Sequence, residues 1–350
     1  MILATKSGTP IIGQIAVVMG WIMNAIYKVL DMVGIQNLGL CIIIFSILIY
    51  LCMTPLQIKQ QKFSKLSAIM QPEIQKIQKK YQGKKDQDSM MKMQEETQAV
   101  YQKYGVSATG SCVQLAIQLP ILYALYQVIQ NIPAYVGSVY NVFNGVYTKI
   151  LAVDGFTDII NNFIADNKMT RVRQVTDNAD SIVDFLYALS PSQWKSLQDI
   201  SQFSGFSDQI SKTASEIQKM QTFGVLNIAD QPLSYIKTGS LILIIAALAI
   251  PLLSWATQML NLKLMPQAAT QNGNDDNNAM ASSMKTINTV MPLMSAFFCF
   301  TFPVGLGIYW IASAVVRSIQ QLLINRHLNK MNIDDLVNCL LYTSPSPRDS

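Results

Sequence analysis

The fold is decided by an apolar stretch near the start of the chain, LGLCIIIFSILIYLCMTPL, residues 38–56. An α-helix rises about 1.5 Å per residue, so about 20 apolar residues are needed to cross the roughly 30 Å hydrocarbon core of a bilayer. No Asp, Glu, Lys or Arg interrupts this stretch. It therefore predicts a membrane-spanning helix rather than a helix in the core of a soluble domain.

Four further stretches have a similar character, and the five predicted spans are residues 37–57, 107–131, 235–262, 286–302 and 303–325. The last two are separated only by the TFPVG turn, which predicts a tight helical hairpin. Of the 350 residues, 13% are charged and 50% are hydrophobic, about half the charge of a typical soluble domain. The composition excludes an ordinary soluble enzyme and a disordered chain, and it predicts an all-α polytopic membrane protein.

The distribution of charge predicts the orientation of these spans. Residues 57–106 carry ten lysines and five acids (net +5), whereas residues 131–232 carry seven basic and ten acidic residues (net −3). Because loops rich in Lys and Arg stay in the cytoplasm, the first segment is predicted inside and the second outside. Five spans then place the N-terminus outside and the C-terminus in the cytoplasm, and they make residues 263–285 a cytoplasmic loop.

The cytoplasmic segment, residues 58–106, is predicted to be a helical hairpin interrupted by QGKKDQD. A largely apolar face recurs at helical spacing on both sides of the break, and in the second half it consists of Met90, Met93, Thr97, Val100 and Tyr104. The lysines form either a solvated face that meets anionic lipid or a contact surface for the ribosome or targeting machinery. The candidates for such contacts are Lys76, Lys79, Lys80, Lys84 and Lys85.

Residues 1–36 hold an apolar stretch with a polar stripe. Trp21, Asn24, Lys28 and Asp31 are spaced 3, 4 and 3 apart, which places them along one side of a helix. We interpret this segment as an amphipathic helix on the outer surface of the membrane. A sixth span and an uncleaved signal sequence are the alternatives.

The outer segment, residues 132–234, contains no apolar run of 20 residues, and we expect a small helical region there. Ser190 and Pro191 have the chemistry of a helix start. The tail, residues 326–350, is predicted to be cytoplasmic and partly artefactual. Its end, CLLYTSPSPRDS, resembles translated cloning sequence, so we expect that the native C-terminus is missing.

The sequence carries no motif for nucleotide, metal or disulfide chemistry. It has a single histidine and no C-x-x-C pair among its five cysteines, so neither a zinc site nor a disulfide framework is indicated. No G-x-x-x-x-G-K-[ST] sequence is present. We therefore expect a protein that is not an enzyme, has no cofactor or metal, and does not bind nucleic acid directly.

Polar side chains form stripes along the predicted spans. Such groups commonly hold helices together in lipid, but stripes that face one another on several helices would form a wet cavity. We take the following residues as candidates for the lining of such a groove: Ser46, Tyr50 and Thr54 in the first span, Gln114 and Gln118 in the second, and Trp310, Ser313 and Arg317 in the last.

Among the charged residues of the predicted spans, Arg317 stands out. It lies nine residues before Arg326, which marks the predicted cytoplasmic end, and nine residues correspond to about 14 Å. The guanidinium is therefore predicted to lie near the midplane of the bilayer. Charged residues at this depth are rare and mostly functional, and no acid is present in any predicted span to pair with Arg317.

Four motifs resemble the YidC/Oxa/Alb family of membrane-protein insertases. They are PLQIKQQKFSKLSAIMQPEIQKIQKKY, QEETQAVYQKYGV, GSCVQLAIQLPILYALYQVI and FPVGLGIYWIASAVVRSIQQ, and the likeness covers residues 38–129 and 240–328. It implies a Gram-positive-like insertase of the bacterial cell membrane with an enlarged outer loop. It also implies a five-span core, a cytoplasmic hairpin, and a hydrophilic groove closed to the outside. The implied partners are nascent membrane proteins, the bilayer, the ribosome, the signal-recognition receptor and the Sec translocon.

This chain departs from the family pattern at the groove. The family usually carries an arginine five residues before the PL pair, where this chain has Tyr50. Gln118 matches a groove glutamine and Trp310 a groove-side aromatic residue, whereas Ala314 replaces a common asparagine. Tyr50 lies nine residues before Lys59, just as Arg317 lies nine before Arg326. We infer that the groove charge has moved to another helix at the same depth.

Two alternatives belong to other functional classes. A small anion transporter or channel would use Arg317 as its anion site, and such proteins often contain internal repeats, which we do not find in this sequence. A purely structural assembly factor beside a translocon is the second alternative. Neither requires that a guest helix enter the groove.

Overall fold

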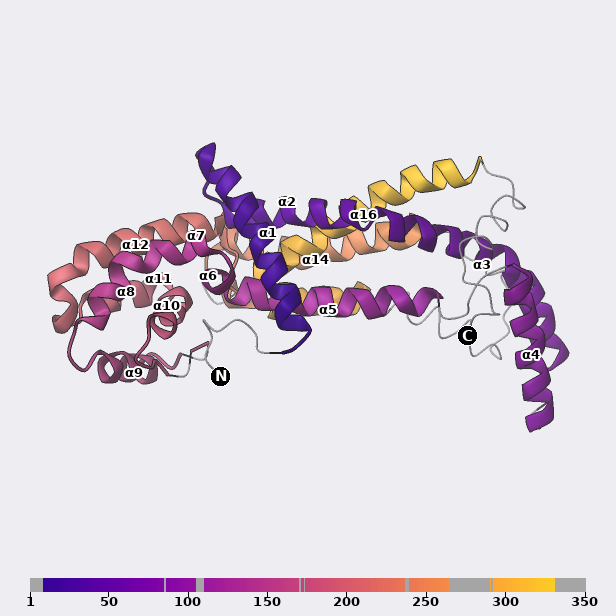
Figure 1. Cartoon of the computed structure of the whole chain (residues 1–350), viewed down its shortest axis with the longest axis horizontal. Helices are drawn as coiled ribbons and strands as arrows, with labels where there is room; N and C mark the ends of the chain where they lie inside the picture. The colour runs from indigo at the N-terminus through magenta and orange to yellow at the C-terminus, as the bar shows by residue number, and fades with distance from the viewer. Residues whose placement is uncertain are drawn as a thin grey trace. The chain divides into compact units, whose positions relative to one another are not determined.

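The computed structural model describes residues 9–84, 86–104, 110–169, 171–172, 174–236, 239–264, 290 and 292–330, with the side chains of residues 110–118 excepted. These residues are mostly α-helical with almost no strand, which confirms the predicted all-α class (Figure 1). The predicted loop 263–285 and the end of the tail lie largely outside the described residues. The chain divides into two compact units, one of Met1–Ser46, Gln118–Ile250 and Cys299–Tyr309, the other of Ile47–Ile117, Pro251–Phe298 and Trp310–Ser350.

Helices occupy all five regions predicted to span the membrane. They are α2 (Leu38–Cys52), α5 (Gly110–Gln130), α14 (Leu241–Leu264), a shorter helix (Pro292–Thr301) and α16 (Val304–Leu328). By length and composition, α14 and α16 could each cross a membrane unaided. α2 passes the same test only together with α3, from which it is bent by 61°. The apolar side chains of α14 are largely exposed in the protein, as lipid-facing residues are.

Helix α1 (Ile12–Met32) packs one face against the rest of the first unit. Ala16, Met23 and Tyr27 are buried on that face, while Trp21 is 72% exposed on the other. Asn24 is not part of a fully exposed polar stripe, because its side-chain oxygen accepts hydrogen bonds from the backbone N–H and the hydroxyl of Ser138. The helix is also long and apolar enough to span a membrane, so its position on the outer surface stays a prediction.

Residues 132–234, which are predicted to lie outside, form a small bundle of short helices in the first unit. They are α6 (Ile132–Tyr135), α7 (Gly137–Tyr140), α8 (Asn144–Leu151), α9 (Phe156–Asp166), α10 (Ala179–Ala188), α11 (Pro191–Gln198), α12 (Ser207–Gln221) and α13 (Pro232–Tyr235), with 3-10 turns at Asn141–Phe143 and Ser201–Phe206. α11 begins where Ser190 and Pro191 predicted a helix start. Ser190 and Gln193 form a reciprocal capping box there. The bundle has its own apolar core, which includes Phe143, Phe185 and Phe203.

A short segment after α12, residues 222–230, contacts the first turns of α2 and α16, and we call it the clasp. It contains two paired antiparallel strands, β1 (Thr222–Phe223) and β2 (Leu226–Asn227). Asn37 caps α2 by accepting a hydrogen bond from Leu40 N–H, and its Nδ2 donates to the carbonyl oxygen of Thr222 (2.8 Å). The clasp is therefore bonded directly to the start of the first apolar helix.

The clasp also completes the start of the last helix. The backbone N–H groups of Val304 and Gly305 donate to the carbonyl oxygens of Asp230 and Ile228, each at 2.8 Å. These donors have no partner within their own helix, because the first four N–H groups of an α-helix lack an intrahelical acceptor. The clasp thus holds the N-terminal turns of two helices that are far apart in the sequence.

Two glycines make room for this contact. A Cβ added at Gly39 would lie 2.5 Å from Cδ2 and 2.7 Å from Cβ of Phe223. A Cβ added at Gly305 would lie 3.2 Å from the carbonyl oxygen of Ile228. Both glycines lie in the first turn of their helices, so a side chain there would push the clasp away.

We expect Gly39→Ala to destabilise the protein by about 1–3 kcal/mol, because overpacking of a close contact costs this much. The measurement is the melting temperature of the full chain in detergent. Gly137→Ala is the matched control, since nothing lies within 4 Å of its added Cβ and it should melt like the wild type. Phe223→Ala should reduce the cost of Gly39→Ala, and strictly additive losses would contradict this explanation.

The second unit contains a helical hairpin of α3 (Thr54–Lys80) and α4 (Gln87–Lys103). Its narrow seam is formed by Met70, Ile74 and Val100, whereas Leu66 of α3 packs against Leu328 of α16. Met90 was predicted in this seam but is 56% exposed, because the helices contact one another in only a few turns and Met90 lies near the tip. Only Met53 separates α2 from α3, so the hairpin is nearly continuous with the first apolar helix.

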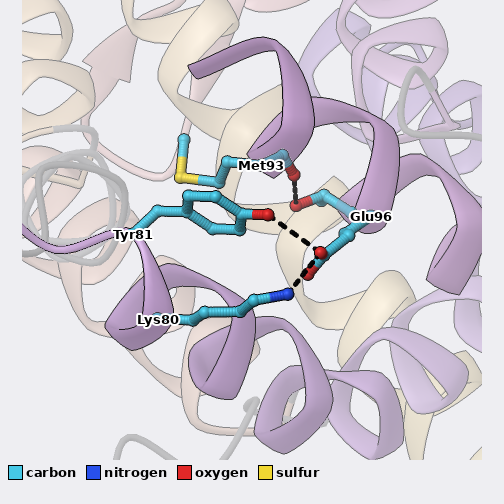
Figure 2. A network of polar contacts seen from close by, with 5 residues as sticks. Lys80, Tyr81, Met93 and Glu96 are labelled. Carbon is cyan, nitrogen blue, oxygen red and sulfur yellow. Dashed lines mark hydrogen bonds and ion pairs between the residues drawn. The ribbon is translucent and has the colours of Figure 1, made fainter. Parts of the chain in front are cut away.

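Ion pairs fix the two hairpin helices antiparallel to one another. Glu73 pairs with Lys103 (3.0 Å). Glu96 pairs with Lys80 (2.5 Å) and accepts a hydrogen bond from the Tyr81 hydroxyl (2.9 Å), as Figure 2 shows. The Lys80 and Tyr81 hydrogen bonds hold the pKa of Glu96 below its usual value. All these groups are largely solvated, so they set the register of the hairpin more than its stability.

Candidate functional site

A polar cluster in the second unit gathers side chains from four helices, and we call it the polar site. On α14, Ser254, Gln258 and Asn261 are spaced 4 and 3 apart and therefore share one face of an otherwise apolar helix. This face contacts polar residues of α16, which in turn contact the end of α2 and the start of α3. The remaining members of the polar site are Tyr50, Thr54, Ser313, Arg317, Ser318, Gln320 and Gln321.

Arg317 is half-buried in the polar site and is held by neutral groups. Its Nη2 donates to Oε1 of Gln258 (3.4 Å) and its Nε donates to the carbonyl oxygen of Ser313 (3.4 Å). The guanidinium carbon lies 5.5 Å from the centre of the Tyr50 ring, a cation–π distance. In the part of the chain that the structure describes, every ion pair lies in the hairpin, and no carboxylate neutralises Arg317.

The remaining hydrogen bonds of the polar site join its helices. Nε2 of Gln320 donates to the carbonyl oxygen of Tyr50 (2.8 Å) and to the hydroxyl of Thr54 (2.9 Å). Nδ2 of Asn261 lies 3.5 Å from the hydroxyl of Ser318 and 3.4 Å from Oε1 of Gln321. Amide side chains thus bridge the helices, as they commonly do in lipid.

Several buried polar atoms in this cluster have no protein partner among the described residues. They are the hydroxyl of Ser254, Oε1 of Gln320 and Nε2 of Gln321. Ser254 is completely buried, and both glutamines are less than one-tenth exposed. A buried polar atom without a hydrogen bond costs about 1–3 kcal/mol, and such atoms in native proteins are mostly paired with water.

The predicted groove residues fall into three groups. Tyr50, Thr54, Ser313 and Arg317 come together in the polar site, and Trp310 lies one turn before Ser313, whose hydroxyl donates to its carbonyl oxygen. Ser46 belongs to the first unit and donates to the carbonyl oxygen of its own helix at Ile42. The side chains of Gln114 and Gln118 lie outside the described residues.

The predicted contact lysines of the hairpin differ in their surroundings. Lys80 is engaged by Glu96, whereas Lys76 and Lys79 are exposed. Lys84 is exposed and lies over the ring of Tyr81, at 5.6 Å. Lys85 lies outside the described residues. Lys76, Lys79 and Lys84 are therefore the better candidates for a partner or a lipid surface.

The predicted groove residues did not include Ser254, Gln258 and Asn261. The signal was present, because three polar residues at helical spacing interrupt the apolar stretch LLSWATQMLNL. The described residues contain no group of three or more His, Cys, Asp or Glu side chains that could hold a metal ion. The chemistry of the polar site is therefore that of one cation surrounded by amides, hydroxyls and an aromatic ring.

A sequence profile of the 60Kd inner membrane protein family matches residues 26–331. The match includes α2 to α16 and therefore every residue of the polar site. It also includes the whole outer segment and the clasp.

Curated relatives match over shorter stretches. The chain is 45% identical over 99 residues to membrane protein insertase MisCA of Bacillus subtilis, which covers 28% of this chain and 38% of that protein. It is 40% identical over 98 residues to membrane protein insertase YidC of Oceanobacillus iheyensis, with the same shares. It is 35% identical over 117 residues to YidC of Bifidobacterium longum, which covers 32% of this chain and 35% of that protein. In each case the match spans just over a third of the length of the relative.

Proposed function

The chain belongs to the 60Kd inner membrane protein family, and from this premise we propose that it is a membrane protein insertase of the bacterial membrane. It would integrate other membrane proteins, and help them to fold, by receiving a polar segment of the guest chain in the polar site. The observation that carries this proposal is Arg317, a half-buried cation surrounded by neutral groups among the described residues.

The free hydrogen-bonding capacity of Arg317 suits a guest carboxylate. A guanidinium has five N–H donors, and the structure uses one on Nε and one on Nη2. Three donors have no partner among the described residues, including both hydrogens of Nη1. Arginine and a carboxylate form short bidentate hydrogen bonds, so an acidic residue of the guest would bind better than a neutral one.

Water in the polar site would lower the free-energy cost of a charged guanidinium at this depth in the bilayer. The unpaired atoms of Ser254, Gln320 and Gln321 are acceptors and donors that water satisfies. A hydrated polar site would shorten the path that a polar guest segment must take through hydrocarbon. We propose that the polar site lines the groove implied by the family likeness, and that this groove opens to the cytoplasm and to lipid.

The driving force would come from the guest and not from a nucleotide. Once its polar end has crossed, the apolar helix of the guest leaves the groove for lipid. Burial of each CH₂ group contributes about 0.8 kcal/mol. The contact with Arg317 must be transient, because a strongly bound guest would not be released.

The orientation and the partners are part of the proposal. The hairpin of α3 and α4 would lie in the cytoplasm together with the C-terminus, and the helical outer segment would lie outside together with α1 and the N-terminus. Lys76, Lys79 and Lys84 would then face the ribosome, the signal-recognition receptor or anionic lipid. Association with the Sec translocon would bring further guests to the same groove.

Reconstitution in liposomes tests the proposal directly. The full chain should insert a small phage-coat-type protein with an acidic outer segment in the absence of ATP, as measured by protection from added protease. Liposomes without the chain are the control. Chloride or phosphate flux through the chain, with no insertion, would overturn the proposal in favour of an anion transporter or channel.

A further inference from the structure

Gln258 is the side chain that accepts a hydrogen bond from the Arg317 guanidinium. Its Oε1 lies 3.4 Å from Nη2, close to the upper limit for such a bond. The carbonyl oxygen of Ser313 receives the Nε–H at the same distance, and the Tyr50 ring lies on the guanidinium face. Two weak acceptors and one aromatic face thus orient the guanidinium, and none of the three carries a negative charge.

An amide and a carboxylate at position 258 would have opposite consequences for a guest. The amide orients the guanidinium and leaves its positive charge in place. A carboxylate would form a charge-assisted bidentate pair with Arg317. Because that carboxylate would be tethered beside the cation, its effective concentration would exceed that of any guest acid.

We propose that Gln258 is a positioning residue that sets the selectivity of the polar site for guests with acidic outer segments. It holds Arg317 in place through a bond that a guest carboxylate can replace, and its neutrality keeps the charge available. This inference rests on the proposed insertase function and adds to it a residue on α14 that keeps the charge of Arg317 available to a guest.

A role for Gln258 in joining α14 to α16 alone would give a different result. Glutamate would meet that role at least as well as glutamine, since an Arg–Glu pair holds the same contact more strongly. The Gln258→Glu variant therefore distinguishes a role of Gln258 in guest selectivity from a role in helix packing. It also leaves Arg317 itself unchanged.

The experiment compares two guests that differ only in whether the outer segment carries acidic residues or Asn and Gln. Insertion is measured by protease protection in cells depleted of their own insertase, with the full chain at matched levels. Gln258→Glu should reduce insertion of the acidic guest about tenfold or more relative to that of the neutral guest. Its melting temperature in detergent should not fall below that of the wild type. Gln258→Leu removes the hydrogen bond to Arg317 but adds no negative charge. It should therefore reduce insertion of the acidic guest less than Gln258→Glu does.

Thr257→Glu is the matched control. Thr257 precedes Gln258 by one residue, and its hydroxyl bonds back to the carbonyl oxygen of Leu253 on its own helix. A carboxylate there lies at the same depth but about 100° around the helix from Gln258. It should leave the ratio of acidic to neutral guest insertion unchanged.

The outcomes distinguish this inference from the proposed function. If Arg317→Ala lowers the acidic-to-neutral ratio but Gln258→Glu does not, the role of Gln258 is overturned and the proposed function stands. If neither variant changes the ratio, the role of Arg317 in the proposed function fails as well. Equal loss of both guests in Gln258→Glu would indicate general damage and would also overturn the selectivity role.

Discussion

Arg317→Ala should reduce the insertion of guests with acidic outer segments by about tenfold to a hundredfold. The reason is that a hydrogen-bonded charge pair is worth about 1.5–3 kcal/mol, and each 1.4 kcal/mol corresponds to a factor of ten. Arg317→Lys should retain part of the activity, because lysine supplies the charge but not the planar fork of donors. Insertion is measured by protease protection in cells depleted of their own insertase.

Moving the arginine from position 317 to position 50 gives a second test of this role. The Arg317 guanidinium carbon lies 5.5 Å from the Tyr50 ring, so an arginine at position 50 would deliver its charge to nearly the same place. Tyr50→Arg should therefore restore insertion to the Arg317→Ala protein. Arg326→Ala is the control, since it removes an exposed cation from the same helix nine residues further on. Equal insertion of acidic guests by the wild type and Arg317→Ala would refute the role of the cation.

Asp184→Asn should stabilise the outer helical segment by about 4 kcal/mol at pH 7. Asp184 is 6% exposed within α10, and its Oδ2 has no hydrogen-bond partner among the described residues. Burial, together with the nearby Asp180 carboxylate, raises the pKa of Asp184 from 3.8 to about 8. The folded protein must therefore keep a proton that the unfolded chain releases, and each unit of pH above 3.8 costs about 1.4 kcal/mol up to the folded pKa.

Because the pKa of Asp184 is raised in the folded protein, the stability of this segment should depend on pH in a characteristic way. The wild-type segment should be most stable below pH 4 and lose stability as the pH rises toward 8, whereas Asp184→Asn should keep the low-pH stability throughout. Hydrogen exchange of α10 amides in the full chain measures this stability at each pH. Asp199→Asn, which alters an exposed carboxylate of the same segment, should follow the wild-type profile. A wild-type segment with no loss of stability between pH 5 and 8 would contradict the burial argument.

The elements that depend on long apolar runs could be predicted from the sequence. The run at residues 38–56 indicated a helix at the place where α2 lies, and Ser190 marked the start of α11. Hydrophobic periodicity also indicated the two helices of the hairpin. These features are local, because they depend on the character of successive side chains and not on distant partners.

The clasp could not be predicted in the same way. Strands of two residues show no alternation, and Gly39 and Gly305 look like any other small residues within apolar helices. Their role follows from contacts with Phe223 and Ile228, which are 184 and 77 residues away in the sequence. The depth of Arg317 could be estimated by counting residues, but its contacts with Gln258 and Tyr50 depend on how three helices pack.

The clasp has a consequence for how the chain is made. The acceptor for the Val304 N–H is the carbonyl oxygen of Asp230, which leaves the ribosome 74 residues earlier. At about 5–20 residues per second, this interval is about 4–15 seconds. The oxygens that complete the first turn of the last helix therefore exist before that helix is synthesised. We expect translation to reach α16 when the carbonyl oxygens of Asp230 and Ile228 are already available, so that the first turn of α16 can bond to the clasp as soon as it is made.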